Sequence, residues 1–391
     1  MKIPEIDTVC FVGAGTMGCV NAITAGLAGY SVIIYDLSAA SLEAVPARFQ
    51  EIADYLVAQA LCPQAMLDYV VSQIRLTDNL AEATAQADLV SESVFESLAL
   101  KREVHEKLDK ICSPDTLITT NTSGLLVSEI EDVISDDRGR LFAALHSHMG
   151  SPLVDIVGGP RTTQSTIDIL ERYVLSLSGV PLILKKENPG YVLNAMLGPV
   201  LATAMLMVQN GVATVEEVDR AWISQAGVSI GPFGLIDLFG LNVIYDSWLN
   251  KKPGANYDAT KSKIMALITP FIEAGNLGAK SGKGFYLYPN PAYSTPEFLA
   301  ADDHSVGTNF ALLSSALINA AVLLAVNDVA SPETIDNAWN ISMATAQGPF
   351  ELLQALGGKA YLQRLDAQFT EGWFDKELNA PVKAYIAERF V

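Results

Sequence analysis

Apolar runs alternate with helical patterns from residue 7 to about residue 150, further apolar runs follow, and each run has the length of a buried strand. Between the runs, apolar positions recur every three or four residues, as they do on one face of a helix. Seven runs are predicted to form strands: residues 9–12, 31–35, 87–94, 116–120, 141–145, 153–157 and 180–184. Strands that alternate with helices are typical of a parallel sheet covered on both faces. We therefore predict a doubly wound α/β domain over residues 1–186.

From Tyr191 onward the pattern is helical, with many Ala, Leu and Met residues and few β-branched runs. An internal repeat lies here, because positions 117 residues apart carry the same residue. The matching pairs are Asn210/Asn327, Ala213/Ala330, Glu216/Glu333, Asp219/Asp336, Ala221/Ala338, Trp222/Trp339, Gly231-Pro232-Phe233/Gly348-Pro349-Phe350, Leu235/Leu352 and Gly240/Gly357. The repeat predicts two related all-α domains, residues 187–295 and 296–391, packed side by side. The segment from Gly282 to about Asp303 contains three prolines and is predicted to link them.

The charge and the hydropathy pattern exclude several kinds of partner. The net charge is −19, from 44 Asp and Glu residues against 25 Lys and Arg residues, which argues against binding to nucleic acid or to an anionic membrane. No uninterrupted apolar stretch reaches the ~18 residues of a membrane span, and residues 195–208 and 311–326 are predicted to be buried helices. The first strand begins close to Met1, which leaves no room for a signal peptide and predicts a cytoplasmic protein.

The cysteines, His105 and His304 give no sign of a metal centre or of a catalytic role. The four cysteines have no metal-ligand spacing and are predicted to be reduced structural thiols; they are Cys10, Cys19, Cys62 and Cys112. No metal centre is predicted. His105 and His304 have no special context and are expected at the surface. The aromatic residues of the repeat are expected in its core: Trp222, Phe233, Trp339 and Phe350.

A glycine-rich segment directly follows the first predicted strand and opens a helix. In Gly-x-Gly-x-x-Gly, Gly13 permits a tight turn, Gly15 lets the backbone approach a pyrophosphate, and Gly18 lets helix and strand pack closely. The helix N-terminus, with Thr16 and Met17, offers unpaired N–H groups to that phosphate. The second strand ends at Asp36, 23 positions past Gly13, where an acidic residue would bind the adenosine ribose hydroxyls. No arginine follows Asp36 closely, so the sequence predicts NAD as cofactor.

Several further motifs follow in a characteristic order. They are Gly13-Ala14-Gly15-Thr16-Met17-Gly18, Glu96-Ser97-Leu98-Ala99-Leu100-Lys101, Asn121-Thr122-Ser123, Pro152-Leu153-Val154-Asp155, Asn188-Pro189-Gly190-Tyr191-Val192-Leu193-Asn194, Gly231-Pro232-Phe233 and Lys280-Ser281-Gly282-Lys283-Gly284-Phe285-Tyr286. Together they resemble the 3-hydroxyacyl-CoA dehydrogenase family over nearly the whole chain. Family members with a duplicated C-terminal domain exist, and the 117-residue repeat resembles that arrangement.

The resemblance implies roles for matching residues. A histidine, here His146, takes the proton of the substrate's 3-hydroxyl while a hydride passes to NAD, and Asp155 orients its imidazole. Ser123 and Asn194 match positions near the reacting centre, and Asn194 implies a site in the cleft between the first domain and the first helical copy. Three residues match or adjoin positions that contact the cofactor: Glu96, Lys101 and Asn121.

The chain departs from the family pattern around the histidine. The family has His-x-x-Asn-Pro, whereas Met149-Gly150 follows His146-Ser147-His148 here. The loop to the carboxylate is about three residues shorter than usual, and Asp155 replaces a glutamate, so its side chain is one methylene shorter. A shorter loop could draw Asp155 closer and offset this. His148 remains an alternative base.

Other interpretations stay open at the remaining positions. Asp155 could be a structural hydrogen-bonding residue, Asn194 could cross-link helices, and Glu96 and Lys101 could lie on a solvated charged face. The helical stretch after the second strand usually supplies lysines to CoA phosphates, but between Ser38 and Leu76 this chain has only Arg48 and Arg75 as cationic residues. The first-ranked function is NAD-dependent interconversion of a 3-hydroxyacyl-CoA and a 3-ketoacyl-CoA in fatty acid metabolism. The alternatives are a dehydrogenase of a small non-CoA 3-hydroxy acid and a nucleotide-binding relative without turnover.

The repeat also bears on assembly. In the family the helical domain mediates dimerisation, and a second copy in the same chain could take the partner's place. We therefore expect a monomer with an internal pseudo-dimer, and a small-molecule substrate as its ligand.

Overall fold

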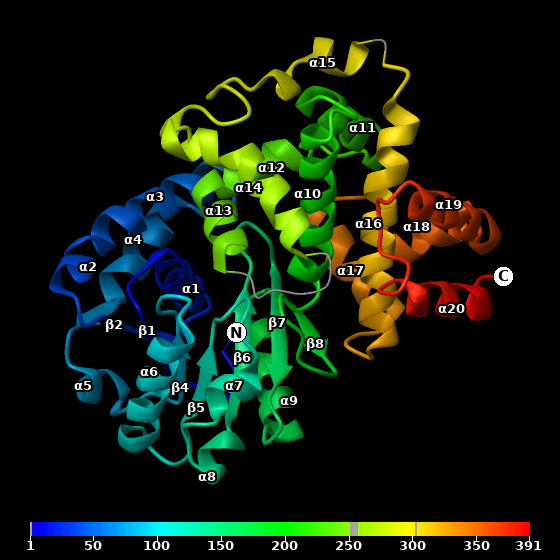
Figure 1. Ribbon diagram of the computed structural model, residues 1–391. Coiled ribbons are helices and arrows are strands. Elements are labelled where there is room, and N and C mark those ends of the chain that lie inside the picture. Colours follow the sequence, from blue (N-terminus) through cyan, green and yellow to red (C-terminus); the bar gives the residue numbers. More distant parts are fainter. Residues whose placement is uncertain (1, 251–256, 302) are drawn as a thin grey trace. The chain divides into compact units, whose positions relative to one another are not determined.

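The computed structural model describes residues 2–250, 257–301 and 303–391 (Figure 1). The chain forms two compact units, Met1–Tyr191 and Val192–Val391. The first contains the predicted α/β domain. The second is one compact unit that covers the two segments predicted as helical domains, 187–295 and 296–391, apart from residues 187–191, which belong to the first unit. Residue 302 of the predicted linker lies outside the described residues.

The first unit is built on one eight-stranded sheet in the order β3-β2-β1-β4-β5-β6-β7-β8. The strands are β1 (Thr8–Val12), β2 (Ser31–Tyr35), β3 (Arg75–Thr77), β4 (Leu89–Glu92), β5 (Leu117–Thr120), β6 (Phe142–Ser147), β7 (Leu153–Gly158) and β8 (Val180–Leu184). All seven predicted strands are present. β3 was not predicted, because it is short and partly polar and carries no apolar run.

The strands between residue 7 and about residue 150 pair in parallel, as predicted, and the direction changes only at the next strand, β7. β7 runs antiparallel to β6, and β8 is parallel to β7, while all other neighbours pair in parallel. The reason is the connection: the segment 148–152 is far too short for the crossover that a parallel pair requires, so the chain turns back as a hairpin. This hairpin sets the predicted histidine and carboxylate on adjacent strands.

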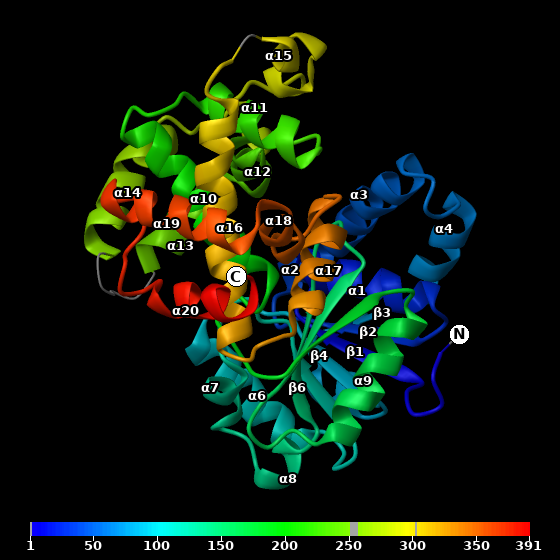
Figure 2. The same ribbon diagram turned by 90° about the vertical axis from the view of Figure 1, so that its right-hand side faces the viewer.

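Among the described residues 2–191, nine helices accompany the sheet. They are α1 (Thr16–Leu27), α2 (Ala39–Glu43), α3 (Val45–Ala58), α4 (Gln64–Gln73), α5 (Leu80–Thr84), α6 (Leu98–Ile111), α7 (Val127–Glu131), α8 (Asp136–Gly139) and α9 (Gln164–Ser176). α1 packs against α3 and α4 (Figure 2). α9 packs against β7 and β8. All four cysteines are free and buried, as predicted for structural thiols.

The second unit is helical. Its helices are α10 (Leu193–Gln209), α11 (Val215–Ala226), α12 (Pro232–Phe239), α13 (Leu241–Asn250), α14 (Tyr257–Glu273), α15 (Pro296–Ala300), α16 (Val306–Val326), α17 (Pro332–Met343), α18 (Pro349–Leu356), α19 (Gly358–Thr370) and α20 (Ala380–Arg389). α11, α12 and α13 recur as α17, α18 and α19, each beginning 117 residues later. α15 and two short 3₁₀ helices, Ala279–Ser281 and Ala292–Ser294, lie in or next to the predicted linker.

Matching residues of the repeat make matching contacts. Asp219 accepts hydrogen bonds from the N–H groups of Phe233 (2.8 Å) and Gly234 (3.0 Å) at the start of α12. Asp336 accepts equivalent bonds from the N–H groups of Phe350 (2.8 Å) and Glu351 (3.1 Å) at the start of α18. A Cβ at Gly231 or Gly348 would lie 2.5 Å from an atom of the corresponding aspartate. The repeated Gly-Pro-Phe motif therefore leaves room for a buried carboxylate that caps the helix.

The longest helix of the second unit is apolar enough to cross a membrane by length and composition. This helix is α16, and 72% of its most apolar 18-residue window is buried. It packs against α10, α11, α18 and α20. α16 is thus a core helix of its unit, in agreement with the prediction for residues 311–326.

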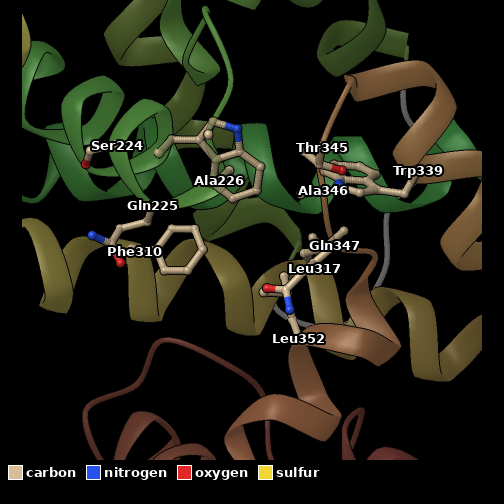
Figure 3. A pocket seen from close by; sticks show the side chains of 12 residues that line it. Ser224, Gln225, Ala226, Phe310, Leu317, Trp339, Thr345, Ala346, Gln347 and Leu352 are labelled. Atoms are coloured by element: carbon tan, nitrogen blue, oxygen red, sulfur yellow. The ribbon is translucent and has the colours of Figure 1, made fainter.

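The aromatic residues of the repeat are buried as predicted, and two of them meet. The rings of Trp222 and Trp339 contact edge to face, with 6.2 Å between their centroids. They line a cavity of about 210 Å³ together with Phe310, Thr345 and Gln347 (Figure 3). Among the residues that line this cavity, none was predicted to act in catalysis or cofactor binding.

Replacing Asp219 with alanine is expected to lower the free energy of unfolding of the second unit by about 2 kcal/mol. Two buried N–H groups and the hydroxyl of Tyr286, 2.9 Å from Asp219, would lose their acceptor. Urea unfolding followed by tryptophan fluorescence measures this, because all four tryptophans lie in the second unit: Trp222, Trp248, Trp339 and Trp373. Asp246→Ala, at an exposed position of α13, is the control and should have little effect; equal stability of both variants would contradict the capping role.

Candidate active site

The glycine-rich loop between β1 and α1 has the geometry of a dinucleotide cradle. Gly13 has φ of +115°, and a Cβ there would lie 2.7 Å from the carbonyl oxygen of Ser93. A Cβ at Gly18 would lie 1.9 Å from the carbonyl oxygen of Gly13. A Cβ at Gly15, by contrast, would meet no described atom within 4 Å, so this side of the loop is open. The open side at the start of α1, next to Thr16 and Met17, fits a pyrophosphate.

Asp36 lies against this loop. Its Oδ2 accepts a hydrogen bond from the N–H of Ala14 (2.8 Å), and its Oδ1 accepts one from the N–H of Ser38 (2.8 Å). The carboxylate thus stands beside the glycine loop, which fits the binding of adenosine ribose hydroxyls. Arg48 also reaches the loop, donating from Nη1 to the carbonyl oxygens of Ala14 (2.9 Å) and Ser41 (3.0 Å). No sequence signal pointed to this position of Arg48.

Replacing Asp36 with alanine is expected to weaken NADH binding about tenfold, which corresponds to ~1.4 kcal/mol, and to narrow the preference for NADH over NADPH. The ribose hydroxyls would lose a charged acceptor, and a 2′-phosphate would no longer meet a carboxylate. Titration of NADH and NADPH fluorescence measures both affinities. Asp137→Ala, at an exposed position of α8, is the matched control. An unchanged NADH affinity in Asp36→Ala would contradict the assignment.

The β6–β7 hairpin brings His146 and Asp155 together. The two residues are direct cross-strand partners in the antiparallel register, and Nδ1 of His146 lies 2.9 Å from Oδ2 of Asp155. Asp155 is fully buried. The short loop therefore offsets the shorter side chain, as the sequence analysis suggested. The hydrogen bond through Nδ1 leaves Nε2 of His146 for other chemistry.

His148 shares the same carboxylate oxygen. Its Nε2 lies 2.7 Å from Oδ2 of Asp155, and the rings of His146 and His148 have centroids 4.4 Å apart. Burial acts to raise the pKa of Asp155, but hydrogen bonds from His146 and His148 outweigh it and hold that pKa below its usual value. The carboxylate is therefore ionised and accepts from both rings. The two histidines differ in the nitrogen that faces Asp155: Nδ1 in His146 and Nε2 in His148.

Tyr191 packs beside His146 and was not predicted as a site residue. Its ring is buried, with its centroid 5.5 Å from that of His146, and its hydroxyl has no hydrogen-bond partner among the described residues. Its backbone is left-handed (φ +50°), and Asn188 donates from Nδ2 to its carbonyl oxygen (3.0 Å). The Asn-Pro-Gly-Tyr motif was the signal available in the sequence.

Asn121, Ser123 and Glu96 lie together at the carboxyl ends of β4 and β5. Oδ1 of Asn121 accepts a hydrogen bond from the N–H of Ser147 (2.9 Å) and so ties β5 to the histidine strand. Oε1 of Glu96 accepts from the N–H groups of Ser123 (3.0 Å) and Gly124 (2.9 Å). Burial acts to raise the pKa of Glu96, but Lys101 and these hydrogen bonds lower it overall. In parallel sheets this edge is where ligands bind.

Lys101 and His105 of α6 are buried, which rules out one alternative for Lys101 and corrects the expectation for His105. Lys101 pairs with Glu92 (2.8 Å) and with Glu96 (3.4 Å), so it is not part of a solvated charged face. His105, expected at the surface, lies 3.2 Å from Glu92 and is fully buried. The helix carries charged residues on most faces, and a buried ion pair looks like a surface one in the sequence. Contact of Lys101 with the cofactor stays a prediction, as does the role of Asn194, which lies in the first turn of α10 in the second unit.

Comparisons with known proteins identify the family of the chain. The family model of the 3-hydroxyacyl-CoA dehydrogenase NAD binding domain matches residues 8–187, and that of the 3-hydroxyacyl-CoA dehydrogenase C-terminal domain matches residues 190–288. A probable 3-hydroxyacyl-CoA dehydrogenase of Caenorhabditis elegans is 30% identical over 301 residues, which are 73% of this chain and 94% of the relative.

Two further similarities concern a relative with a differently named substrate and a solved structure that covers nearly the whole chain. The 5-formyl-3-hydroxy-2-methylpyridine 4-carboxylate 5-dehydrogenase of Mesorhizobium japonicum is 27% identical over 290 residues, 72% of this chain and 91% of the relative. The crystal structure of 3-hydroxybutyryl-CoA dehydrogenase from Escherichia coli K12 has a TM-score of 0.78 and 21% identity, covering 98% of this chain and 99% of that one. At that identity the second similarity bears on the fold alone, which it extends over nearly the whole chain.

Proposed function

Because the chain belongs to the 3-hydroxyacyl-CoA dehydrogenase family, whose members are NAD-dependent oxidoreductases, we propose that it interconverts a 3-hydroxyacyl-CoA and a 3-ketoacyl-CoA with His146 as the general base. The observation that carries this proposal is the cross-strand pair of His146 and Asp155. A buried carboxylate on Nδ1 leaves Nε2 as the nitrogen that can accept a proton.

In the oxidation, Nε2 of His146 takes the proton of the 3-hydroxyl as the C3–O bond becomes a carbonyl. Bound NAD supplies the acceptor for the hydride that leaves C3. Asp155 keeps the proton of the imidazole on Nδ1 and balances the positive charge that the ring acquires. In the reduction, the charged ring returns its proton to the 3-oxygen. Asn121 holds the end of β6 in place through Ser147, and Ser123 lies at the neighbouring strand end.

A second candidate function is supported by the positions of the cations. Arg48 donates to backbone carbonyls of the glycine loop and α2, and Arg75 pairs with Glu82 at 3.1 Å. Both cationic residues of the stretch expected to bind CoA phosphates are thus already engaged. A small 3-hydroxy acid without CoA needs no such cations, and the relative from Mesorhizobium japonicum is named for a pyridine carboxylate substrate.

The test is NADH oxidation by the purified protein with acetoacetyl-CoA and with free acetoacetate, compared side by side. We expect a clear preference for the thioester. Activity on the free acid alone would overturn the CoA assignment in favour of the small 3-hydroxy acid. If the protein binds NADH but reduces neither substrate, the result would support the third alternative, a nucleotide-binding relative without turnover.

We also infer that the helices from α16 onward are a duplicate of those from α10 onward, so that one chain holds a pseudo-dimer. The recurring helix starts and the paired aspartate caps support this. We propose that the protein is a cytoplasmic monomer that acts in fatty acid metabolism and binds neither nucleic acid nor membrane. Sedimentation velocity should give one species with the mass of a single chain, and a tight dimer at low concentration would overturn the pseudo-dimer.

A further inference from the structure

His146, His148 and Asp155 form a cluster with a feature that hydride transfer does not use. His146 lies on β6 and His148 follows directly after its end, the centroids of their rings are 4.4 Å apart, and Asp155 lies opposite His146 in the register. Nδ1 of His146, Nε2 of His148 and a carboxylate oxygen of Asp155 all lie within 4.8 Å of one another. One histidine would suffice to act as a base.

The donor set matches the preferences of a divalent transition metal. Two imidazole nitrogens and one carboxylate oxygen are ligands that zinc accepts at ~2.0–2.2 Å, and a tetrahedral ion holds its ligands roughly 3.4 Å apart. The two nitrogens now lie 2.9 Å and 2.7 Å from Oδ2 of Asp155, so the side chains need to separate only slightly. Oδ1 of Asp155 is buried without a hydrogen-bond partner among the described residues. The carboxylate thus has an unused acceptor inside the cluster.

We propose that His146, His148 and Asp155 bind one divalent transition metal ion, with zinc as the physiological class, and that a water completes the coordination. No metal centre was predicted from the sequence, because the cysteines lack metal-ligand spacing and the histidines were assigned to proton transfer. The antiparallel turn at β7 is what closes the cluster, and it was not predicted.

Metal binding and proton transfer exclude one another at His146, an inference that rests on the proposed function. A neutral imidazole that coordinates a metal through Nδ1 carries its proton on Nε2. The proton leaves Nδ1, Nε2 gains one from solvent, and the ring stays neutral. Nε2 then donates instead of accepting, so it cannot take the proton of the substrate hydroxyl. Bound zinc therefore acts as an inhibitor.

Titration with Co²⁺ tests the site directly, because cobalt reports its ligands through visible absorption. The wild-type protein should bind one Co²⁺ per chain, and Zn²⁺ should displace it. His148→Phe, which keeps a ring of similar size but removes one ligand, should weaken Co²⁺ binding at least tenfold. His304→Phe, a histidine of the second unit, is the control and should bind as the wild type does. NADH binding confirms that each variant is folded.

Absence of stoichiometric Co²⁺ binding, or equal binding by the wild type and His148→Phe, would overturn the metal site. A second measurement addresses its consequence: added Zn²⁺ should inhibit NADH oxidation, EDTA should restore it, and His148→Phe should require at least tenfold more Zn²⁺. If the protein turns over neither substrate, the proposed function fails while the Co²⁺ titration still decides whether the metal binds.

Discussion

Replacing His146 with glutamine is expected to lower kcat about 10³-fold, within the range that a general base contributes. Glutamine retains an amide near Asp155 but has no group that accepts a proton at neutral pH. His148→Gln is the matched variant, since it removes the other imidazole on the same carboxylate oxygen. It is expected to lower kcat by no more than about tenfold, because Nε2 of His148 faces Asp155. Steady-state kinetics with the better of the two acetoacetyl substrates measures both.

Cofactor binding separates loss of the base from loss of the fold. Both variants should bind NADH with the affinity of the wild type, because the glycine loop and Asp36 follow β1 and β2 and are not part of the hairpin. The assignment fails if the results are reversed, so that kcat falls about 10³-fold in His148→Gln and His146→Gln stays active. His148 would then be the base, and Nδ1 of its ring would be the nitrogen that accepts the proton, because Nε2 faces Asp155.

The sequence predicted most of the sheet because a buried strand needs a continuous apolar run, and seven such runs were present. It failed at β3, where Arg75, Leu76 and Thr77 form an edge strand whose side chains are not buried. It also made no prediction of the direction of β7. Loop length decides that direction, and the short segment 148–152 was counted as a departure from a family pattern and not as a turn.

Candidate site residues were predictable where a single steric or chemical requirement determines which residue type a position can hold. Gly13 and Gly18 are examples, since any side chain there would collide with backbone. Partners were not predictable where they depend on the fold. Asp155 was assigned to one histidine, yet the hairpin presents it to two. His105 looked like a surface residue, yet α6 turns it toward Glu92.

The charge cluster under α6 carries the largest expected effect on stability. Replacing Lys101 with methionine is expected to lower the free energy of unfolding of the first unit by about 3–5 kcal/mol, because removal of one partner leaves the buried carboxylate of Glu92 uncompensated. Lys107→Met is the matched control on the same helix. Lys107 pairs with Glu103 at 2.6 Å in solvent, and its loss should cost less than about 0.5 kcal/mol.

Urea unfolding measures the difference, with NADH binding as the reporter of the first unit. Tryptophan fluorescence reports only the second unit and should show an unchanged midpoint in Lys101→Met. Equal stability of the two lysine variants would show that Glu92 is satisfied without Lys101, by His105 and by the hydroxyl of Thr120, which lies 2.7 Å from it.

The pH dependence gives an independent check on the same carboxylate. Burial acts to raise the pKa of Glu92, but the hydrogen bond from His105 and the charge of Lys101 outweigh it and lower the pKa to about 2. In the unfolded chain a glutamate has a pKa of about 4.3. Since the folded value is the lower one, the stabilisation is complete above about pH 5 and is lost as the pH falls toward 2. Glu92→Gln removes this titration, so its unfolding free energy should change less between pH 5 and pH 3 than that of the wild type. Parallel curves for the two proteins over that range would mean that Glu92 is not the group whose protonation destabilises the first unit.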